Sequence, residues 1–141
     1  MNISVFGLGY VGCVTIGCLA SKGNSIIGVD ISDKKMKLIE SGKSTVVENG
    51  LDDLIYEGVK KGLITTSDNV EYAVNNSDIA IICVGTPNND KGFLDMKYIR
   101  KVTEDIAKVL KKKNKYFTLS IRSTVNPGTN DEMNAIIENI S

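Results

Sequence analysis

Short apolar runs alternate along the chain with segments whose apolar residues recur every three or four positions. Continuous apolar runs are typical of strands buried on both faces, whereas the wider spacing indicates amphipathic helices. The pattern predicts strands at residues 3–6, 26–29, 63–66, 79–84 and 117–121, separated by helices at residues 11–22, 32–41, 51–61, 68–74, 95–110 and 129–140.

This regular alternation predicts an α/β fold. We expect a Rossmann-type doubly wound parallel sheet in a three-layer α/β/α arrangement, with right-handed crossovers. Two helix starts have the spacing of a capping box, one with Asp68 and Glu71 and one with Thr129 and Glu132. At 141 residues the chain forms one domain, residues 1–141, which is short for a complete two-substrate enzyme.

The turn after the first expected strand has the spacing G-x-G-x-x-G, in Gly7-Leu8-Gly9-Tyr10-Val11-Gly12. Such a string is weak alone, but here it lies between a strand and a helix, and the second strand ends on Asp30. In that context Gly7 permits a tight turn, Gly9 permits close approach of a pyrophosphate, and Gly12 lets the helix lie against the strand. A carboxylate at Asp30 can bind both ribose hydroxyls of an adenosine and would repel a 2′-phosphate, which favours NAD over NADP.

Composition narrows the function further. Lysine and arginine number 17, as do aspartate and glutamate, so the charge balance indicates neither nucleic-acid nor membrane binding. The chain has no histidine, which excludes a histidine base, a Ser-His-Asp triad and a histidine metal site, and we expect no metal. Without an expected signal peptide or membrane-spanning run, the predicted location is cytoplasmic.

The three cysteines have neither C-x-x-C spacing nor an even count, so disulfides and zinc are not expected. Cys18 and Cys83 are interpreted as small apolar fillers. Cys13 follows the glycine turn near a helix start, where a thiolate is favoured, but a residue packed beneath a pyrophosphate is a poor nucleophile. We therefore interpret it as structural.

Two threonines follow later strands, Thr86 in Gly85-Thr86-Pro87 and Thr124 in Arg122-Ser123-Thr124. Because the carboxyl ends of parallel strands meet at one edge, both are expected beside the glycine turn, where ligands bind in such sheets. Each hydroxyl could equally bond its own turn. Lys35, in the first turn of the second helix, is unfavourable to the helix dipole unless an anion lies nearby, and an exposed surface role is equally compatible with its position.

Four segments in order resemble one family: MNISVFGLGYVGCV, GVDISDKK, ICVGTP and IRSTVNPGT. They look like the N-terminal NAD-binding domain of the nucleotide-sugar 6-dehydrogenases, which comprise the UDP-glucose and GDP-mannose dehydrogenases. The resemblance covers essentially the whole chain in register. GKSTVVENGL and RSTVNPGT look closest to the GDP-mannose branch, although the UDP-glucose branch has similar segments.

The resemblance implies an NAD-dependent oxidation of the sugar C6 alcohol to a carboxylate with two NAD+, through a thiohemiacetal and a thioester on a cysteine. It also implies a role for each matched residue. Asp30 and Lys35 would hold the adenosine ribose, and Thr86 and Thr124 would lie along the nicotinamide half. Thr124 would also lie near the reacting centre and help to orient a water. The residues implied to hold the pyrophosphate are Gly7, Gly9, Tyr10, Val11 and Gly12.

The chain departs from the family pattern in ways that bear on activity. The family's catalytic cysteine lies in a glycine-rich segment well downstream, beyond a helix with a lysine and an asparagine, and no cysteine here matches it. The sixth strand of the sheet is also absent, as is the middle region through which the family forms homodimers. We therefore expect this chain to bind NAD without turnover. Asn49 stands where the family usually has proline, so the loop at residues 43–50 is expected to be less rigid.

Other classes share part of this pattern. A stand-alone nucleotide-sensing regulatory domain, of the kind that gates potassium transport, has a similar length, glycine turn and ribose acid, but no reason to carry the GTP and RSTV loops. Another Rossmann dehydrogenase, such as a 3-hydroxyacid type, fits the later motifs less well. A methyltransferase is disfavoured because those enzymes typically show G-x-G-x-G.

Overall fold

The computed structural model describes residues 1–92 and 94–140, so position 93 of the expected loop 88–94 and position 141 lie outside the described residues. The strands are β1 (Asn2–Phe6), β2 (Ser25–Val29), β3 (Ile64–Ser67), β4 (Ile79–Ile82) and β5 (Thr118–Ile121). The helices are α1 (Tyr10–Ser21), α2 (Asp33–Glu40), α3 (Leu51–Lys60), α4 (Val70–Asn75), α5 (Lys97–Leu110) and α6 (Thr129–Ile140). All the expected elements are present, with ends that differ by a few residues.

The five strands form one parallel sheet in the order β3-β2-β1-β4-β5, as expected for a doubly wound fold. The chain runs outward from β1 in one direction through β2 and β3, and then crosses to the other side at β4. The switch point therefore lies between β1 and β4, which pair with Ile3 opposite Ile79 and Phe6 opposite Ile82. In a sheet of this kind a ligand binds outside the carboxyl ends of the strands at the switch point.

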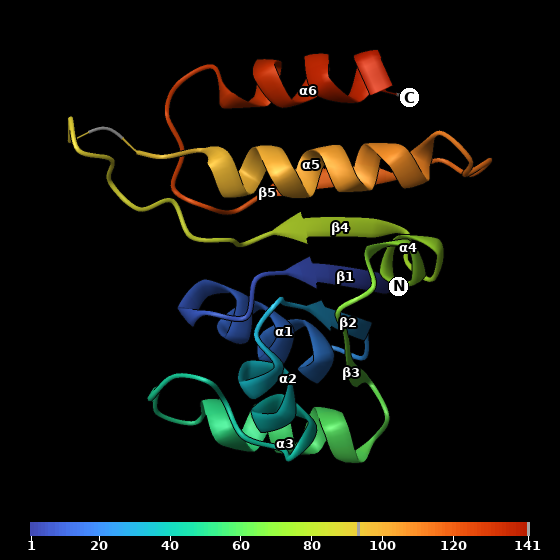
Figure 1. Cartoon of the computed structure of the whole chain (residues 1–141). Helices are drawn as coiled ribbons and strands as arrows, with labels where there is room; N and C mark the ends of the chain where they lie inside the picture. Colours follow the sequence, from blue (N-terminus) through green and yellow to red (C-terminus); the bar gives the residue numbers. More distant parts are fainter. Residues whose placement is uncertain (93, 141) are drawn as a thin grey trace.

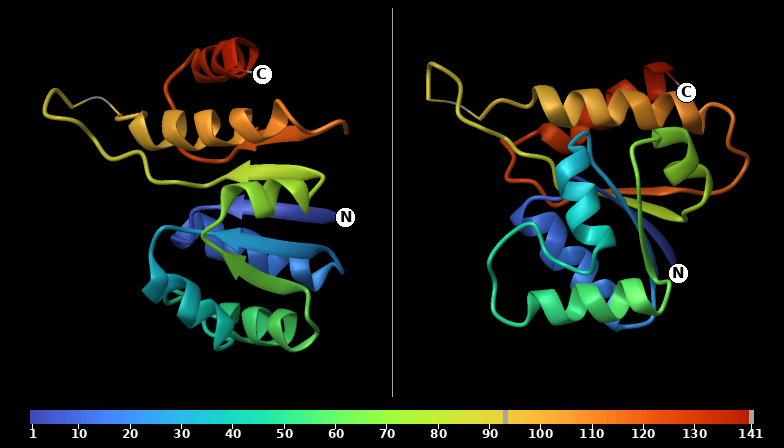
Figure 2. Two further views of the ribbon diagram at one scale, coloured as in Figure 1. Left: turned by 45° about the vertical axis from the view of Figure 1, so that its right-hand side comes forward. Right: turned by 60° about the horizontal axis from the view of Figure 1, so that its bottom comes forward.

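Each face of the sheet carries its own apolar core, because alternate residues of a strand point to opposite faces. Ile3, Val5 and Ile81 lie in the core beneath α1, α2 and α3. Phe6 and Ile82 lie in the core beneath α4, α5 and α6. Figure 2 shows these helices on opposite sides of the strands, which confirms the three-layer arrangement.

Helix α1 packs closely on α3 through small residues. A Cβ atom on Gly17 would come within 3.0 Å of the Leu51 side chain, and Ala20 is buried in the same core. Cys18, by contrast, is exposed on the opposite side of α1, so its interpretation as a packed filler was wrong. The buried residues of α1 include Cys13, Ile16, Gly17 and Ala20, and Cys18 lies outside this set.

The helix starts differ from both expected capping boxes. In α4 the N-cap is Asn69, whose side chain accepts a hydrogen bond from the Tyr72 N–H at 3.0 Å, so Asp68 is not the cap. At α6 the Thr129 hydroxyl donates to the Asn126 carbonyl at 2.6 Å. The Glu132 carboxylate binds Arg100 on α5 instead of returning to its own helix start. Neither capping box forms, because Asn69 caps α4 and Glu132 binds a residue of another helix.

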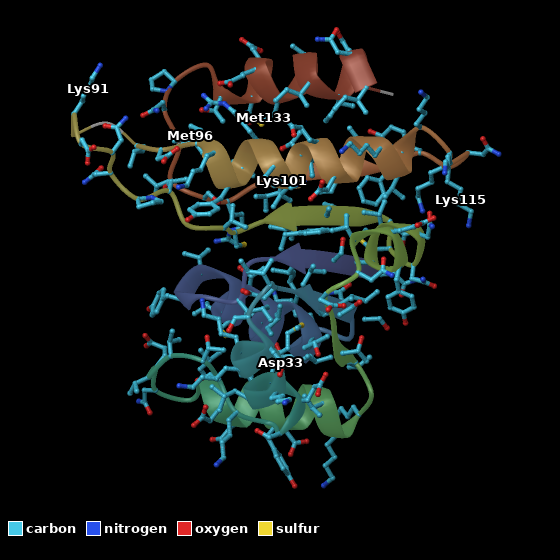
Figure 3. All side chains as sticks on the ribbon, in the orientation of Figure 1. Asp33, Lys91, Met96, Lys101, Lys115 and Met133 are labelled. Atoms are coloured by element: carbon cyan, nitrogen blue, oxygen red, sulfur yellow. The ribbon has the colours of Figure 1, made fainter. Side chains whose placement is uncertain are left out.

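The β4–α5 connection projects away from the body of the domain (Figures 1 and 2). Its two arms are joined by the Asp95 N–H, which donates to the Pro87 carbonyl at 2.7 Å, and by a bridge between Asn88 and Leu94. Lys91 lies near its far end (Figure 3).

In the part of the chain that the structure describes, no helix is both long and apolar enough to span a membrane.

The loop between α2 and α3, residues 43–50, is here called the strap. It ends in a turn in which the Leu51 N–H donates to the Glu48 carbonyl at 3.1 Å and Gly50 has φ 79° and ψ −8°. These values match the third residue of a type II turn, for which proline is favoured at the second residue. Here that second residue is Asn49, which is exposed.

Replacing Asn49 by proline is therefore expected to stabilise the domain. The Asn49 N–H donates to no described residue, so proline would remove no hydrogen bond while restricting the unfolded chain. We expect Asn49→Pro to raise the free energy of unfolding by about 0.4–1 kcal/mol relative to Asn49→Ala, measured by urea denaturation. A proline variant less stable than the alanine variant would contradict the turn assignment.

Candidate functional site: the carboxyl edge of the sheet

The loops that follow β1, β4 and β5 meet at the carboxyl edge of the sheet. In Figure 1 these connections lie together on the side toward which the strand arrows point. The turn after β1 is joined to β2 by the Gly7 N–H, which donates to the Val29 carbonyl at 2.8 Å. The Cys83 N–H joins β4 to β1 by donating to the Phe6 carbonyl at 2.7 Å. The switch point is therefore a connected structure.

Two glycines of the turn are required by close backbone contacts. A Cβ atom on Gly12 would lie 1.8 Å from the Gly7 carbonyl oxygen, and one on Gly7 would lie 2.8 Å from the Cys83 backbone. Gly7 also has φ 101°, a conformation that other residues rarely adopt. These contacts set α1 directly against the end of β1, as the glycine spacing predicts.

Gly9 is different, because nothing lies within 4 Å of the position that its Cβ would take. It is the N-cap of α1, and the first helical hydrogen bond runs from the Cys13 N–H to the Gly9 carbonyl at 2.9 Å. Among the described residues, none accepts a hydrogen bond from the N–H groups of Gly9, Tyr10, Val11 or Gly12. The first turn of α1 has no acidic residue either, so these donors and the positive helix end are available to an anion.

Asp30 lies where the sequence places it, immediately after β2 and beside the glycine turn. Its Oδ2 accepts the Leu8 N–H at 2.8 Å and its Oδ1 accepts the Ser32 N–H at 2.8 Å. These two bonds hold the carboxylate, which is half-buried, at the edge of the turn. A carboxylate can accept further hydrogen bonds, so Asp30 can still bind hydroxyl donors. This geometry fits a ribose, which offers two hydroxyl groups.

Lys35 lies in the first turn of α2, where its N–H donates to the N-cap Ser32 hydroxyl at 3.3 Å. Its side chain is half-buried, and none of the described carboxylates forms an ion pair with it. The acid in this turn, Asp33, pairs with Lys37 at 2.9 Å instead. The lysine thus remains available to an anionic or hydroxyl-bearing ligand, and its role in ribose binding stays a prediction.

Thr86 and Thr124 are brought into direct contact. The Thr86 hydroxyl donates to the Thr124 carbonyl at 2.7 Å, which ties the loop after β4 to the loop after β5. Ser123 adds a second link, because its hydroxyl donates to the Val84 carbonyl at 2.7 Å. The Thr124 side chain is exposed, and its hydroxyl has no partner in residues 1–92 and 94–140. The Thr86 hydroxyl thus joins the two loops, whereas the Thr124 hydroxyl is available, and the roles of both threonines beside the nicotinamide stay predictions.

The buried cysteines are poor nucleophiles in this setting. Burial raises the pKa of Cys83 to about 11, so its thiol stays protonated at neutral pH. Cys13 is fully buried beneath the glycine turn, with its sulfur 2.9 Å from the Thr45 hydroxyl. Both observations agree with the structural role that the sequence predicts for these two residues.

The strap also belongs to this site, although the sequence did not predict it. The Thr45 hydroxyl donates to the Leu8 carbonyl at 2.6 Å, and the Tyr10 hydroxyl donates to Glu48 at 2.7 Å. The hydrogen bond to Glu48, followed by the carboxylate charge, raises the pKa of Tyr10 above its usual value. The signal that could have indicated these contacts is the resemblance of the whole segment GKSTVVENGL to the family.

The residues present fit a dinucleotide. The open space above Gly9 and the four free N–H groups suit a pyrophosphate, and Asp30 suits the adjoining ribose. The threonine loops extend the same edge beyond the turn. The fold and this site define a dinucleotide-binding domain of the Rossmann class.

Comparison with known proteins gives the family. A profile described as the UDP-glucose/GDP-mannose dehydrogenase family, NAD binding domain, matches residues 1–141. The chain belongs to this family, and NAD is its cofactor.

Several relatives are similar along most of the chain. The GDP-mannose 6-dehydrogenase of Pseudomonas syringae pv. tomato is 46% identical over 129 residues, which are 92% of this chain and 30% of that protein. A crystal structure of a ternary complex of GDP-mannose dehydrogenase from Pseudomonas aeruginosa superimposes with a TM-score of 0.97 at 44% identity, covering 100% of this chain and 33% of that one. A UDP-glucose dehydrogenase from Pyrobaculum islandicum has a TM-score of 0.92 at 26% identity, covering 99% and 32%. The chain thus spans about a third of the length of these relatives.

Gly9 and Gly12 should respond differently to the same added methyl group. Gly9→Ala is expected to lower the free energy of unfolding by only about 1 kcal/mol, the usual cost of alanine at an N-cap, because the Cβ meets no atom and φ is −80°. It should weaken NAD+ binding by roughly tenfold or more, since the methyl group occupies the pyrophosphate approach. Gly12→Ala should cost about 3 kcal/mol or more in stability because of the clash with Gly7.

Calorimetric titration with NAD+ and thermal denaturation of both variants would measure these effects. A Gly9→Ala protein that binds NAD+ as tightly as the wild type would contradict the placement of the pyrophosphate.

Asp30 should set both affinity and cofactor choice. We expect NADP+ to bind at least about tenfold more weakly than NAD+, because a 2′-phosphate would face the carboxylate. Asp30→Ala should weaken NAD+ binding by about 1–3 kcal/mol, because it removes the charged hydrogen bonds to the ribose and also the bonds that hold the Leu8 and Ser32 N–H groups. Asp33→Ala is the matched control, since it removes the same charge from an exposed position three residues along. Equal affinity of the wild type for NAD+ and NADP+ would contradict the role of Asp30 in cofactor choice.

Proposed function

We propose that this chain supplies the cofactor-binding part of a nucleotide-sugar 6-dehydrogenase that acts on GDP-mannose. The observation that carries the proposal is the match over residues 1–141 to the family profile, together with 44–46% identity to the Pseudomonas GDP-mannose 6-dehydrogenases. In the proposed reaction the C6 alcohol of the sugar is oxidised to a carboxylate by two NAD+ and one water. Each NAD+ accepts one hydride, and three protons are released.

In this proposal the residues of the chain bind NAD+ and orient its nicotinamide. The N–H groups at the start of α1 hold the pyrophosphate, and Asp30 with Lys35 holds the ribose. The contact between Thr86 and Thr124 supports the placement of these loops beside the nicotinamide. The available hydroxyl of Thr124 would orient a water or the nicotinamide amide near the reacting carbon.

The nucleophile of the reaction is not among the cysteines of this chain. Cys13 and Cys83 are buried, and Cys18 faces outward from α1. We therefore propose that residues 1–141 bind NAD+ without reducing it, and that the covalent steps are carried out by residues beyond this domain. For the whole enzyme we propose a homodimer in the cytoplasm, where an exposed thiol such as Cys18 stays reduced.

The complete product of the gene should form NADH from NAD+ when GDP-mannose is added, with two NADH for each sugar oxidised. Residues 1–141 alone should bind NAD+ in calorimetry and form no NADH with any sugar nucleotide. UDP-glucose and UDP-N-acetylmannosamine are the matched alternatives, and faster turnover of either would reassign the substrate within the family.

A different result would favour the regulatory alternative. If NAD+ or ATP changed the oligomeric state while no sugar nucleotide had any effect, the chain would be better described as a nucleotide-sensing domain. Size-exclusion chromatography with and without each nucleotide separates the two.

A further inference from the structure

Leu8 is held at three points, although it belongs to the loop between β1 and α1. Its side chain is fully buried against Gly28 of β2, where an added Cβ would come within 3.0 Å of Leu8. Its N–H donates to Asp30 at 2.8 Å. Its carbonyl accepts the Thr45 hydroxyl at 2.6 Å and, more weakly, the Cys13 thiol at 3.6 Å.

The hydrogen bond at the Leu8 carbonyl fixes the direction of the next N–H group. The peptide bond between Leu8 and Gly9 is planar and trans, so its carbonyl and its N–H point in opposite directions. Because the Leu8 carbonyl points toward Thr45, the Gly9 N–H points in the opposite direction, away from the strap. That N–H has no acceptor in the described part of the chain, and the space above Gly9 is open.

Thr45 is itself held in place by the strap. The neighbouring Ser44 N–H donates to Asp52 at the start of α3 at 2.8 Å, and this bond lowers the pKa of Asp52. Val46, on the other side, packs against the core beneath α1 and α3. The Thr45 hydroxyl is thus presented to the turn from a strap anchored on both sides.

A second contact between the strap and the turn involves Tyr10, two residues after Leu8, and Glu48, three residues after Thr45. Tyr10, the first residue of α1, donates its hydroxyl to Glu48 at 2.7 Å. The strap therefore contacts both residues that flank Gly9, through the Leu8 carbonyl on one side and the Tyr10 side chain on the other. Of these two contacts, only the one to the Leu8 carbonyl acts directly on a peptide group of the turn, whereas the contact to Tyr10 is made by its side chain.

We propose that Thr45 is a positioning residue of the cofactor site, which orients the Gly9 N–H toward the NAD+ pyrophosphate by binding the Leu8 carbonyl. The inference rests on NAD+ binding at the glycine turn. Without the Thr45 hydroxyl the Leu8–Gly9 peptide keeps only the weaker thiol contact and samples other orientations. The cost of reordering it then appears in cofactor binding.

The test compares Thr45→Val with Thr45→Ser. Valine has nearly the same shape as threonine but no donor, whereas serine retains the hydroxyl. We expect Thr45→Val to weaken NAD+ binding roughly three- to tenfold, the range for loss of one hydrogen bond, and Thr45→Ser to bind nearly as the wild type does. Calorimetry with NAD+ and with ADP-ribose, which shares the pyrophosphate, should show the same loss.

Nuclear magnetic resonance gives a second reading that needs no ligand. The carbonyl carbon shift of Leu8 reports the hydrogen bond it accepts, so it should move in Thr45→Val and return toward the wild-type value in Thr45→Ser. Thr103→Val is the matched control, because it removes a buried hydroxyl of α5 that donates to the Ile99 carbonyl at 2.8 Å. It should lower stability without changing NAD+ affinity.

The outcomes separate this inference from the cofactor assignment. A Thr45→Val protein that binds NAD+ like the wild type while its Leu8 carbonyl shift has moved would overturn the positioning role. The same conclusion follows if Thr45→Ser fails to restore binding. A folded wild-type chain that binds no NAD+ would instead overturn the cofactor role of the whole turn, and this inference with it.

Discussion

The site depends on how closely α1 approaches the end of β1. The Gly7 carbonyl oxygen occupies the space that a Gly12 side chain would need, so the helix axis starts directly above the strand. That placement brings the free N–H groups of α1 to the switch point between β1 and β4, which is where ligands bind in sheets of this kind. A side chain at position 12 would clash with the Gly7 carbonyl and force the start of α1 to move. The anion site is thus a consequence of backbone packing.

Leu8 links this packing constraint to the chemistry of the site. It is a buried residue whose two backbone polar groups need partners, and these come from elements distant in sequence, Asp30 after β2 and Thr45 in the strap. The ribose acid therefore has a structural duty in addition to its expected duty toward the ligand. Because the turn is fixed from both sides before a ligand arrives, little ordering remains to be done on binding, which favours affinity.

The fold and the centre of the site could be predicted from sequence because their signals are local. The buried runs of β1, β2 and β4 identify a parallel sheet, and the glycine spacing followed by Asp30 identifies a dinucleotide turn. The predictions failed where a side chain binds a residue that is distant in sequence. Glu132 has capping-box spacing but binds Arg100, and Thr45 stands in an unremarkable polar loop whose contact with Leu8 spans 37 positions. Such pairings exist only once the helices are packed.

The two parts of the candidate site, at the glycine turn and at the threonine loops, differ in how much of their surroundings this chain supplies. Around the pyrophosphate and ribose, the turn, Asp30 and the strap form a connected network of hydrogen bonds. Along the half proposed for the nicotinamide, the chain offers two loops joined by the Thr86–Thr124 contact, with Thr124 exposed and no residue of β5 fully buried. A hydride transfer needs its surroundings closed against water, and these loops alone do not close them. That asymmetry agrees with the proposal that residues 1–141 hold the cofactor while residues outside this domain would enclose the reacting carbon.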